Sequence, residues 1–150
     1  FVLGVAGGSV VKTLISDFEF TKRITGIELD AEIIEIANTY FGLDKVANFN
    51  CIIDDAERFV ATNNENFDLI IIDIFKDTEM PEFLFQETFI NNIKQRLHKN
   101  GYIVFNMMLL DPSKNEKIEN YLKHFESQNY SKKVLKNIER YNDLIIIRSL

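Results

Sequence analysis

The sequence has few of the residues that characterise disulfide-rich, fibrous or disordered chains. Its 150 residues include one cysteine, two prolines, six glycines and no tryptophan. A single cysteine excludes an intramolecular disulfide, which fits a reducing, cytoplasmic compartment. Little glycine and proline, together with 46% hydrophobic residues, argues against disorder. We therefore expect one domain over residues 1–150, with one core.

Positive charge and long apolar runs are also scarce. Seventeen basic residues against 23 acidic ones give a net charge of −6, which disfavours a nucleic acid as partner and suits a cationic small molecule. No apolar run approaches the roughly 18 residues that span a bilayer, so no membrane partner is expected. The two histidines, His98 and His124, are isolated, so no metal site is predicted. The chain opens on an apolar strand without an initiator Met, which suggests a fragment lacking an upstream N-terminal part.

Strands alternate with helices along the chain. The strands are expected at residues 1–5, 24–28, 47–53, 67–73, 102–106, 132–136 and 144–148. The helices are expected from Ser9, with Phe18 on the inner side, and at residues 31–40, 56–61, 82–97 and 113–127. Ser9 and Asp30 are expected as helix N-caps, and Asn100-Gly101 as the end of the fourth helix. This order predicts a doubly wound α/β fold with a mostly parallel seven-stranded sheet and a C-terminal antiparallel hairpin, connected through residues 140–143.

In such a sheet the ligand lies outside the carboxyl ends of the strands, where the strand order reverses. The first strand ends in Gly4-Val5-Ala6-Gly7-Gly8, whose small residues allow a sharp turn and close backbone approach to a ligand. The second ends at Glu28, a carboxylate able to accept both hydroxyls of a ribose. The third ends before Asp55, which could accept from an adenine amine or equally cap a helix. The fourth ends at Asp73, an acid that follows four aliphatic residues and is typical of a functional position.

The combination of acids narrows the cofactor class. A nicotinamide dinucleotide needs a Gly-x-Gly-x-x-Gly turn, and the spacing of Gly4, Gly7 and Gly8 does not supply it. The third and fourth acids suit instead an adenosine–amino-acid ligand such as S-adenosylmethionine, whose ammonium needs an acceptor.

These segments together resemble the class I S-adenosylmethionine-dependent methyltransferase fold, in its spermidine-synthase-like branch. Residues 4–8 are similar to the Gly-x-Gly-x-Gly turn of that fold, with Ala6 in the middle glycine place. Residues 24–30, 54–59 and 67–75 are similar to its second, third and fourth strand motifs. The resemblance implies a cofactor site made of Gly4, Ala6, Gly7, Gly8, Glu28, Leu29, Asp55, Ala56 and Asp73, with Asp73 also as the catalytic residue.

Two positions depart from the polyamine-making members of that branch. Those aminopropyltransferases hold the amine of a decarboxylated cofactor with an acid in the glycine turn, where this chain has Gly7. They also grip the polyamine with a second acid three residues after the fourth-strand Asp, where this chain has Lys76, with Asp77 one residue late. We therefore expect a methyltransferase that uses S-adenosylmethionine and a small-molecule acceptor. Aminopropyl transfer to a polyamine and a non-catalytic nucleoside-binding or scaffold domain are the alternatives, and a homo-oligomer through the edge hairpin stays open.

Overall fold

The computed structural model describes residues 1–76, 79–108, 110, 113–139 and 141–150. Seven strands form its sheet: β1 (Val2–Leu3), β2 (Ile24–Glu28), β3 (Phe49–Ile53), β4 (Phe67–Ile72), β5 (Leu97–Met108), β6 (Tyr130–Glu139) and β7 (Asn142–Ser149). Five α-helices connect them: α1 (Ser9–Ser16), α2 (Ala31–Phe41), α3 (Ala56–Thr62), α4 (Glu87–Gln95) and α5 (Lys114–Lys123). Two short 3₁₀ helices, η1 (Leu43–Lys45) and η2 (Glu82–Phe85), complete the described elements.

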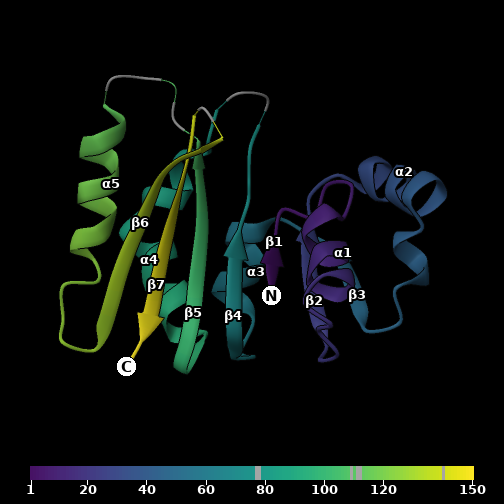
Figure 1. Ribbon diagram of the computed structural model, residues 1–150, viewed down its shortest axis with the longest axis horizontal. Coiled ribbons are helices and arrows are strands. Elements are labelled where there is room, and N and C mark those ends of the chain that lie inside the picture. The colour runs from purple at the N-terminus through teal and green to yellow at the C-terminus, as the bar shows by residue number, and fades with distance from the viewer. Residues whose placement is uncertain (77–78, 109, 111–112, 140) are drawn as a thin grey trace.

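The sheet has the order β3-β2-β1-β4-β5-β7-β6, as Figure 1 shows. The first five strands are parallel, whereas β7 pairs antiparallel with both β5 and β6. The strand order therefore reverses between β1 and β4, next to each other at the centre of the sheet. This arrangement confirms the predicted doubly wound fold with its C-terminal antiparallel hairpin, and it places a crevice at the carboxyl ends of β1 and β4.

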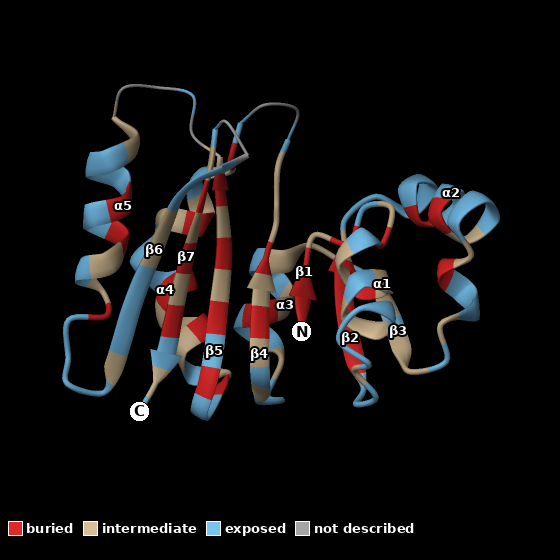
Figure 2. Ribbon diagram, viewed as in Figure 1, coloured by how far each residue is buried: buried red, intermediate tan, exposed pale blue. Residues whose placement is uncertain are grey.

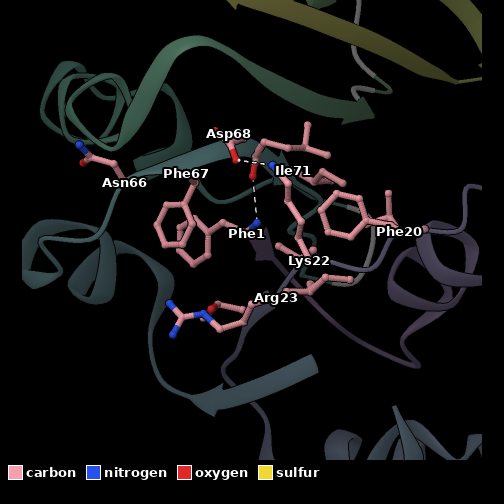
Figure 3. A pocket seen from close by; sticks show the side chains of 13 residues that line it. Phe1, Phe20, Lys22, Arg23, Asn66, Phe67, Asp68 and Ile71 are labelled. Carbon is pink, nitrogen blue, oxygen red and sulfur yellow. Dashed lines mark hydrogen bonds and ion pairs between the residues drawn. The ribbon is translucent and has the colours of Figure 1, made fainter. Parts of the chain in front are cut away.

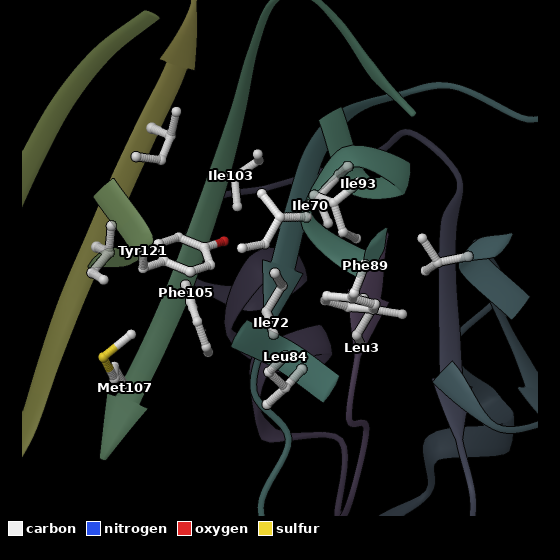
Figure 4. Close-up of a cluster of buried hydrophobic side chains, with 14 of the residues drawn as sticks. Leu3, Ile70, Ile72, Leu84, Phe89, Ile93, Ile103, Phe105, Met107 and Tyr121 are labelled. Carbon is white, nitrogen blue, oxygen red and sulfur yellow. The ribbon is translucent and has the colours of Figure 1, made fainter. Parts of the chain in front are cut away.

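Apolar side chains form two clusters, one for each group of helices. The larger cluster joins alternate residues of β4, β5 and β7 to α3, α4 and α5, and includes Ile72, Phe89, Phe105 and Tyr121 (Figure 4). The smaller one packs α1 and α2 on β1 and β2. Buried residues alternate with partly exposed ones along β5, as the banding in Figure 2 shows. One face of the β4–β5–β7 region is therefore sealed by helices, while the other borders the crevice.

The predicted helix over residues 82–97 is wrong in extent. The chain forms η2, becomes extended at Gln86, and only then forms α4, so that Leu97 already belongs to β5 and pairs with Phe67. The break follows from packing: Leu84 is fully buried, and the Phe83 ring meets the edge of the Phe89 ring at 5.1 Å. Asn100-Gly101 lies inside β5, where Asn100 has a positive φ of 64°, and does not end a helix.

The first helix also differs from the expectation. Ser9 is its first residue, and the capping position is Gly8, with φ 78° and no side-chain cap. Phe18, expected on the inner side, is 72% exposed because α1 ends two residues earlier at Ser16. Asp30, in contrast, caps α2 as predicted and accepts from the N–H groups of Glu32 and Ile33.

The remaining boundaries shift modestly. The first and third strands begin later or end sooner than predicted, and α5 ends at Lys123 rather than near residue 127. The last two strands are longer than predicted, so Asn142 and Asp143, expected in the connection, are the first residues of β7. Asp111, Pro112 and Arg140, which enter the predicted helix start and hairpin connection, lie outside the described residues.

Candidate active site

The glycine turn and the fourth-strand acid meet at the centre of the sheet. Asp73 donates its backbone N–H to the Leu3 carbonyl at 2.8 Å. Gly4 follows with φ +86°, and a Cβ on it would lie 2.1 Å from the Asp73 carbonyl oxygen. Any side chain at Gly4 would therefore separate β1 from β4. Gly4 and Asp73, two of the predicted site residues, are therefore neighbours in the structure. Their close backbone contact leaves no room for a side chain at position 4.

The other two predicted glycines differ in what surrounds them. Gly8 has φ +78°, and a Cβ on it would lie 2.6 Å from a methyl of Leu43. A glycine at this position therefore allows the turn to pack closely on η1. Gly7 has no positive φ, and a Cβ on it would make ordinary contact with the Phe41 ring at 3.6 Å. Ala6, between them and Val5, has φ 45°, a conformation that glycine adopts more easily. Of these residues, Gly7 is the one that has room for a side chain.

Glu28, at the end of β2, joins two turns through its carboxylate. Its Oε2 accepts from the backbone N–H groups of Val5 and Ala6, both at 3.0 Å. Its Oε1 accepts from Leu29 at 2.9 Å and from Asp30 at 3.2 Å. A carboxylate has about four acceptor positions, so the four backbone donors engage it fully. Glu28 lies where the ribose acceptor was predicted, but it also fixes the glycine turn against the start of α2.

The third strand end lies beside the second. The Asp54 N–H donates to the Glu28 carbonyl at 3.0 Å, and the Asp54 carboxylate pairs with the Arg58 guanidinium. Asp55 caps α3 by accepting from the Arg58 N–H at 2.8 Å, and Ala56 is the first residue of that helix. Of the two roles open to Asp55, the structure shows the helix cap. Leu29, next to Glu28, is 70% exposed, so an apolar side chain is accessible at the carboxyl end of β2.

Asp73 lines a cavity of about 550 Å³. Its lining comes from α1 and from β4, β5, β6 and β7, and includes Val10, Ile71, Val104, Leu144 and Ile138. Burial raises the pKa of the Asp73 carboxyl above its ordinary value, and a hydrogen bond from Asn106 opposes that shift. A half-buried carboxylate beside apolar walls suits a cationic group, or a group whose proton must be accepted.

Asn106 and Asn142, two polar residues that line this cavity together with Asp73, were not among the predicted site residues. Asn106 of β5 donates through Nδ2 to Asp73 Oδ1 at 2.8 Å, and its own Oδ1 accepts from Asn142 Nδ2 at 2.9 Å. The sequence does offer a signal for Asn106, because it is a polar residue that directly follows the apolar run of a predicted strand. It gives no sign of Asn142, because that residue reaches the site only through antiparallel pairing of β7 with β5.

The residues after Asp73 turn away from the cavity. Lys76 is exposed, is not among the lining residues, and forms backbone hydrogen bonds with Glu79 at 2.8 and 3.0 Å. Asp77, which the aminopropyl alternative would need in place of the missing acid, lies outside the described residues.

Cys51, the cysteine of this sequence, lies half-buried in β3. Burial, with a smaller contribution from the Glu28 charge, raises its pKa to about 11. A thiol with that pKa is protonated at neutral pH and is a poor nucleophile.

A second cavity, of about 190 Å³, lies at the amino-terminal ends of β1, β2 and β4 (Figure 3). Phe1, Phe20 and Phe67 surround it, and an exposed pair between Lys22 and Asp68 at 3.5 Å borders it. It contains none of the predicted site residues. In the described ranges, no cluster of three or more His, Cys, Asp or Glu side chains could hold a metal ion, and no helix there has the length and hydropathy to cross a bilayer.

Comparison with known proteins places this geometry in a family. The sequence profile of the spermine/spermidine synthase domain matches residues 2–148. The chain belongs to the spermine/spermidine synthase family. A polyamine aminopropyltransferase of Buchnera aphidicola is 30% identical over 125 residues, 80% of this chain and 43% of that protein. An eEF1A lysine and N-terminal methyltransferase homolog of Drosophila pseudoobscura is 30% identical over 134 residues, 83% of this chain and 20% of that protein.

Solved structures confirm the fold of this family member. Human methyltransferase-like protein 13, in complex with SAH, superposes with a TM-score of 0.83 at 19% identity, over 99% of this chain and 70% of that one. A probable spermidine synthase from Corynebacterium glutamicum gives 0.78 at 19% identity, over 99% and 54%. The fold is therefore the Rossmann-like methyltransferase fold, in its spermidine-synthase-like branch, as predicted. The chain spans less than half the length of the curated relatives named above.

Proposed function

We propose that this domain is a group transferase that uses S-adenosylmethionine, and that it transfers a methyl group to a cationic small-molecule acceptor. The observation that carries the proposal is that position 7, in the turn just before α1, is a glycine and offers no acidic side chain. The membership in a family of transferases and the S-adenosylmethionine-type fold support the broader class.

The residues present fit such a nucleoside. Glu28 lies at the second strand end and Asp73 at the fourth, with a cavity of about 550 Å³ beside Asp73. The N-terminus of α1 follows directly after Gly8 and favours a negative group such as an amino-acid carboxylate. A decarboxylated nucleoside lacks that carboxylate and presents a lone ammonium, for which Gly7 offers no acid.

When bound, the nucleoside supplies an activated sulfonium leaving group, so that the protein has chiefly to position the two reactants. Asp73 is the candidate general base or orienting acceptor, because its carboxylate borders the cavity and burial raises its pKa above its ordinary value. Ile71, Val104 and Leu144 give the acceptor apolar walls on one side of the cavity.

A direct competition between S-adenosylmethionine and its decarboxylated form tests the proposal. We expect tighter binding of the intact nucleoside and no spermidine from putrescine. Gly7→Asp, whose Cβ would make ordinary contact with the Phe41 ring at 3.6 Å, should shift the preference toward the decarboxylated form. Gly7→Asn has the same shape without the charge and should not. If the unmodified chain prefers the decarboxylated form by tenfold or more, methyl transfer is the wrong reaction.

Aminopropyl transfer is the second candidate, because relatives at 30% identity bear the name polyamine aminopropyltransferase. It predicts the opposite result of the same competition. Lys76 counts against it, since the place of a polyamine-binding acid is taken by an exposed cation.

A further inference from the structure

We propose that Asn106 and Asn142 are positioning residues, which act in series to hold the Asp73 carboxylate so that its Oδ2 faces the acceptor. The inference concerns the orientation of the acid in the site proposed above and therefore rests on that function for its purpose. Its physical content, a relay of two amides from β7 through β5 to β4, does not depend on any reaction.

The register of the sheet brings the three side chains to one face. Ile72 of β4 pairs with Phe105 of β5, so Asp73 and Asn106 are the next residues of two parallel neighbours. Asn106 pairs with Leu144 of β7, and Asn142 lies two residues before Leu144 on the same face, because side chains of a strand alternate. All three line the same cavity.

The chemistry of the amides fixes the direction of the relay. An ionised carboxylate only accepts hydrogen bonds, so Asn106 must present its Nδ2 to Asp73, as it does at 2.8 Å. The Asn106 oxygen then faces β7 and needs a donor, which is Asn142 Nδ2 at 2.9 Å. Without Asn142, the Asn106 oxygen would lose this donor, and the hydrogen bond to Asp73 would be the one remaining side-chain contact shown for the Asn106 amide. Asn142 thus acts on Asp73 only through Asn106.

A buried anchor holds Asn142 in place. The next residue, Asp143, is 2% exposed, and its Oδ1 accepts from Lys114 Nζ at 3.1 Å and from the Asn137 N–H at 2.9 Å. Lys114 Nζ also donates to the Tyr141 carbonyl at 2.6 Å. The start of α5 and the hairpin are thus joined on both sides of Asn142, which limits the movement of its backbone.

The Asp73 carboxyl itself reports on the relay, without cofactor or turnover. Among the described residues that line the cavity, Asp73 is the only one with an ionisable side chain. Its titration can be followed by carbon NMR and assigned with the Asp73→Asn variant. The Asn106 hydrogen bond lowers its pKa, so Asn106→Ala should raise the midpoint. Asn142→Ala should raise it as well, in the otherwise unmodified chain.

The decisive measurement is the double-mutant cycle. Asn142→Ala should have no further effect in the Asn106→Ala background, because the relay is already broken. An equal rise in both backgrounds, or no rise in either, would overturn the proposal. Asn66, exposed just before the start of β4 and away from this cavity, provides the control: Asn66→Ala should leave the midpoint unchanged. A failed nucleoside-binding experiment would not alter any of these results, so the two proposals fail separately.

The unmodified chain offers a second measurement in case the Asn142 variant does not fold. The side-chain N–H signals of Asn106 should shift with the Asp73 midpoint, and those of Asn142 should follow with smaller amplitude. Asn142 signals that do not respond to the titration would contradict a relay.

Discussion

Glu28 holds two turns together at the position where the ribose of a nucleoside was predicted. Its carboxylate accepts four backbone N–H groups from two turns, and two of those donors are 22 and 23 residues away in the sequence. The contacts hold the first turn open toward the crevice. A ribose at this point would share or replace some of these hydrogen bonds, so removal of Glu28 affects stability together with binding.

Glu28→Gln should therefore destabilise the fold, although it keeps the shape of the side chain. Whichever way the amide points, its NH₂ group faces two backbone N–H donors. We expect a loss of about 1.5–3 kcal/mol in the free energy of unfolding, the range for hydrogen bonds to charged groups. Urea denaturation measures it. Glu35→Gln, at an exposed position of α2, is the matched control. Equal stability of both variants would show that the carboxylate does not hold the turns.

Gly4, Glu28 and Asp73 were predicted at strand ends, because a parallel sheet brings such ends together whatever the details of packing. The close approach of the Gly4 backbone to the Asp73 carbonyl and the four donors of Glu28 were not predictable, since both depend on distances between segments far apart in sequence.

At the scale of elements, tertiary packing decided where local pattern was ambiguous. The apolar and polar residues after Glu82 fit one helix, but the burial of Leu84 and the ring contacts of Phe83 divide it at Gln86. The hairpin was predicted as an edge feature. The position of Asn142 beside Asn106 was not predicted, because the antiparallel register of β7 carries no signal in a single sequence.

The pair between Asp143 and Lys114 anchors that hairpin to α5. Asp143→Ala leaves Lys114, whose side chain is 16% exposed, without its carboxylate and the Asn137 N–H without its acceptor. Breaking a buried pair in this way costs about 3 kcal/mol. The matched control is Asp68→Ala, which breaks a pair with Lys22 in which both side chains are more than 70% exposed. That loss should be below about 1 kcal/mol. Thermal or urea unfolding distinguishes them, and similar values would refute the buried-anchor argument.

In the molecule as a whole, the two apolar clusters lie on opposite faces of the sheet and share the central strand β1. The cluster of α1 and α2 contains Val2 and Val5, whereas the cluster of α3, α4 and α5 contains Leu3 and Ile72. A ligand that contacts Glu28 on one side and Asp73 on the other therefore bridges both halves of the sheet. Such a ligand stabilises the entire fold and not one turn alone.

Binding of S-adenosylmethionine should accordingly raise the unfolding temperature of the whole chain in one transition. At a hundredfold excess over Kd the stabilisation is about 2.7 kcal/mol. For a chain of this size, that corresponds to roughly 5–10 °C. NAD should give no shift, because the turn lacks the dinucleotide spacing, and the Glu28→Gln variant should lose most of the shift that S-adenosylmethionine produces. Differential scanning calorimetry, with the far-ultraviolet and near-ultraviolet signals followed in parallel, tests both the shift and the single transition. A chain stabilised by neither S-adenosylmethionine nor its decarboxylated form would favour the scaffold alternative, since a crevice built for such a nucleoside must respond to one of the two.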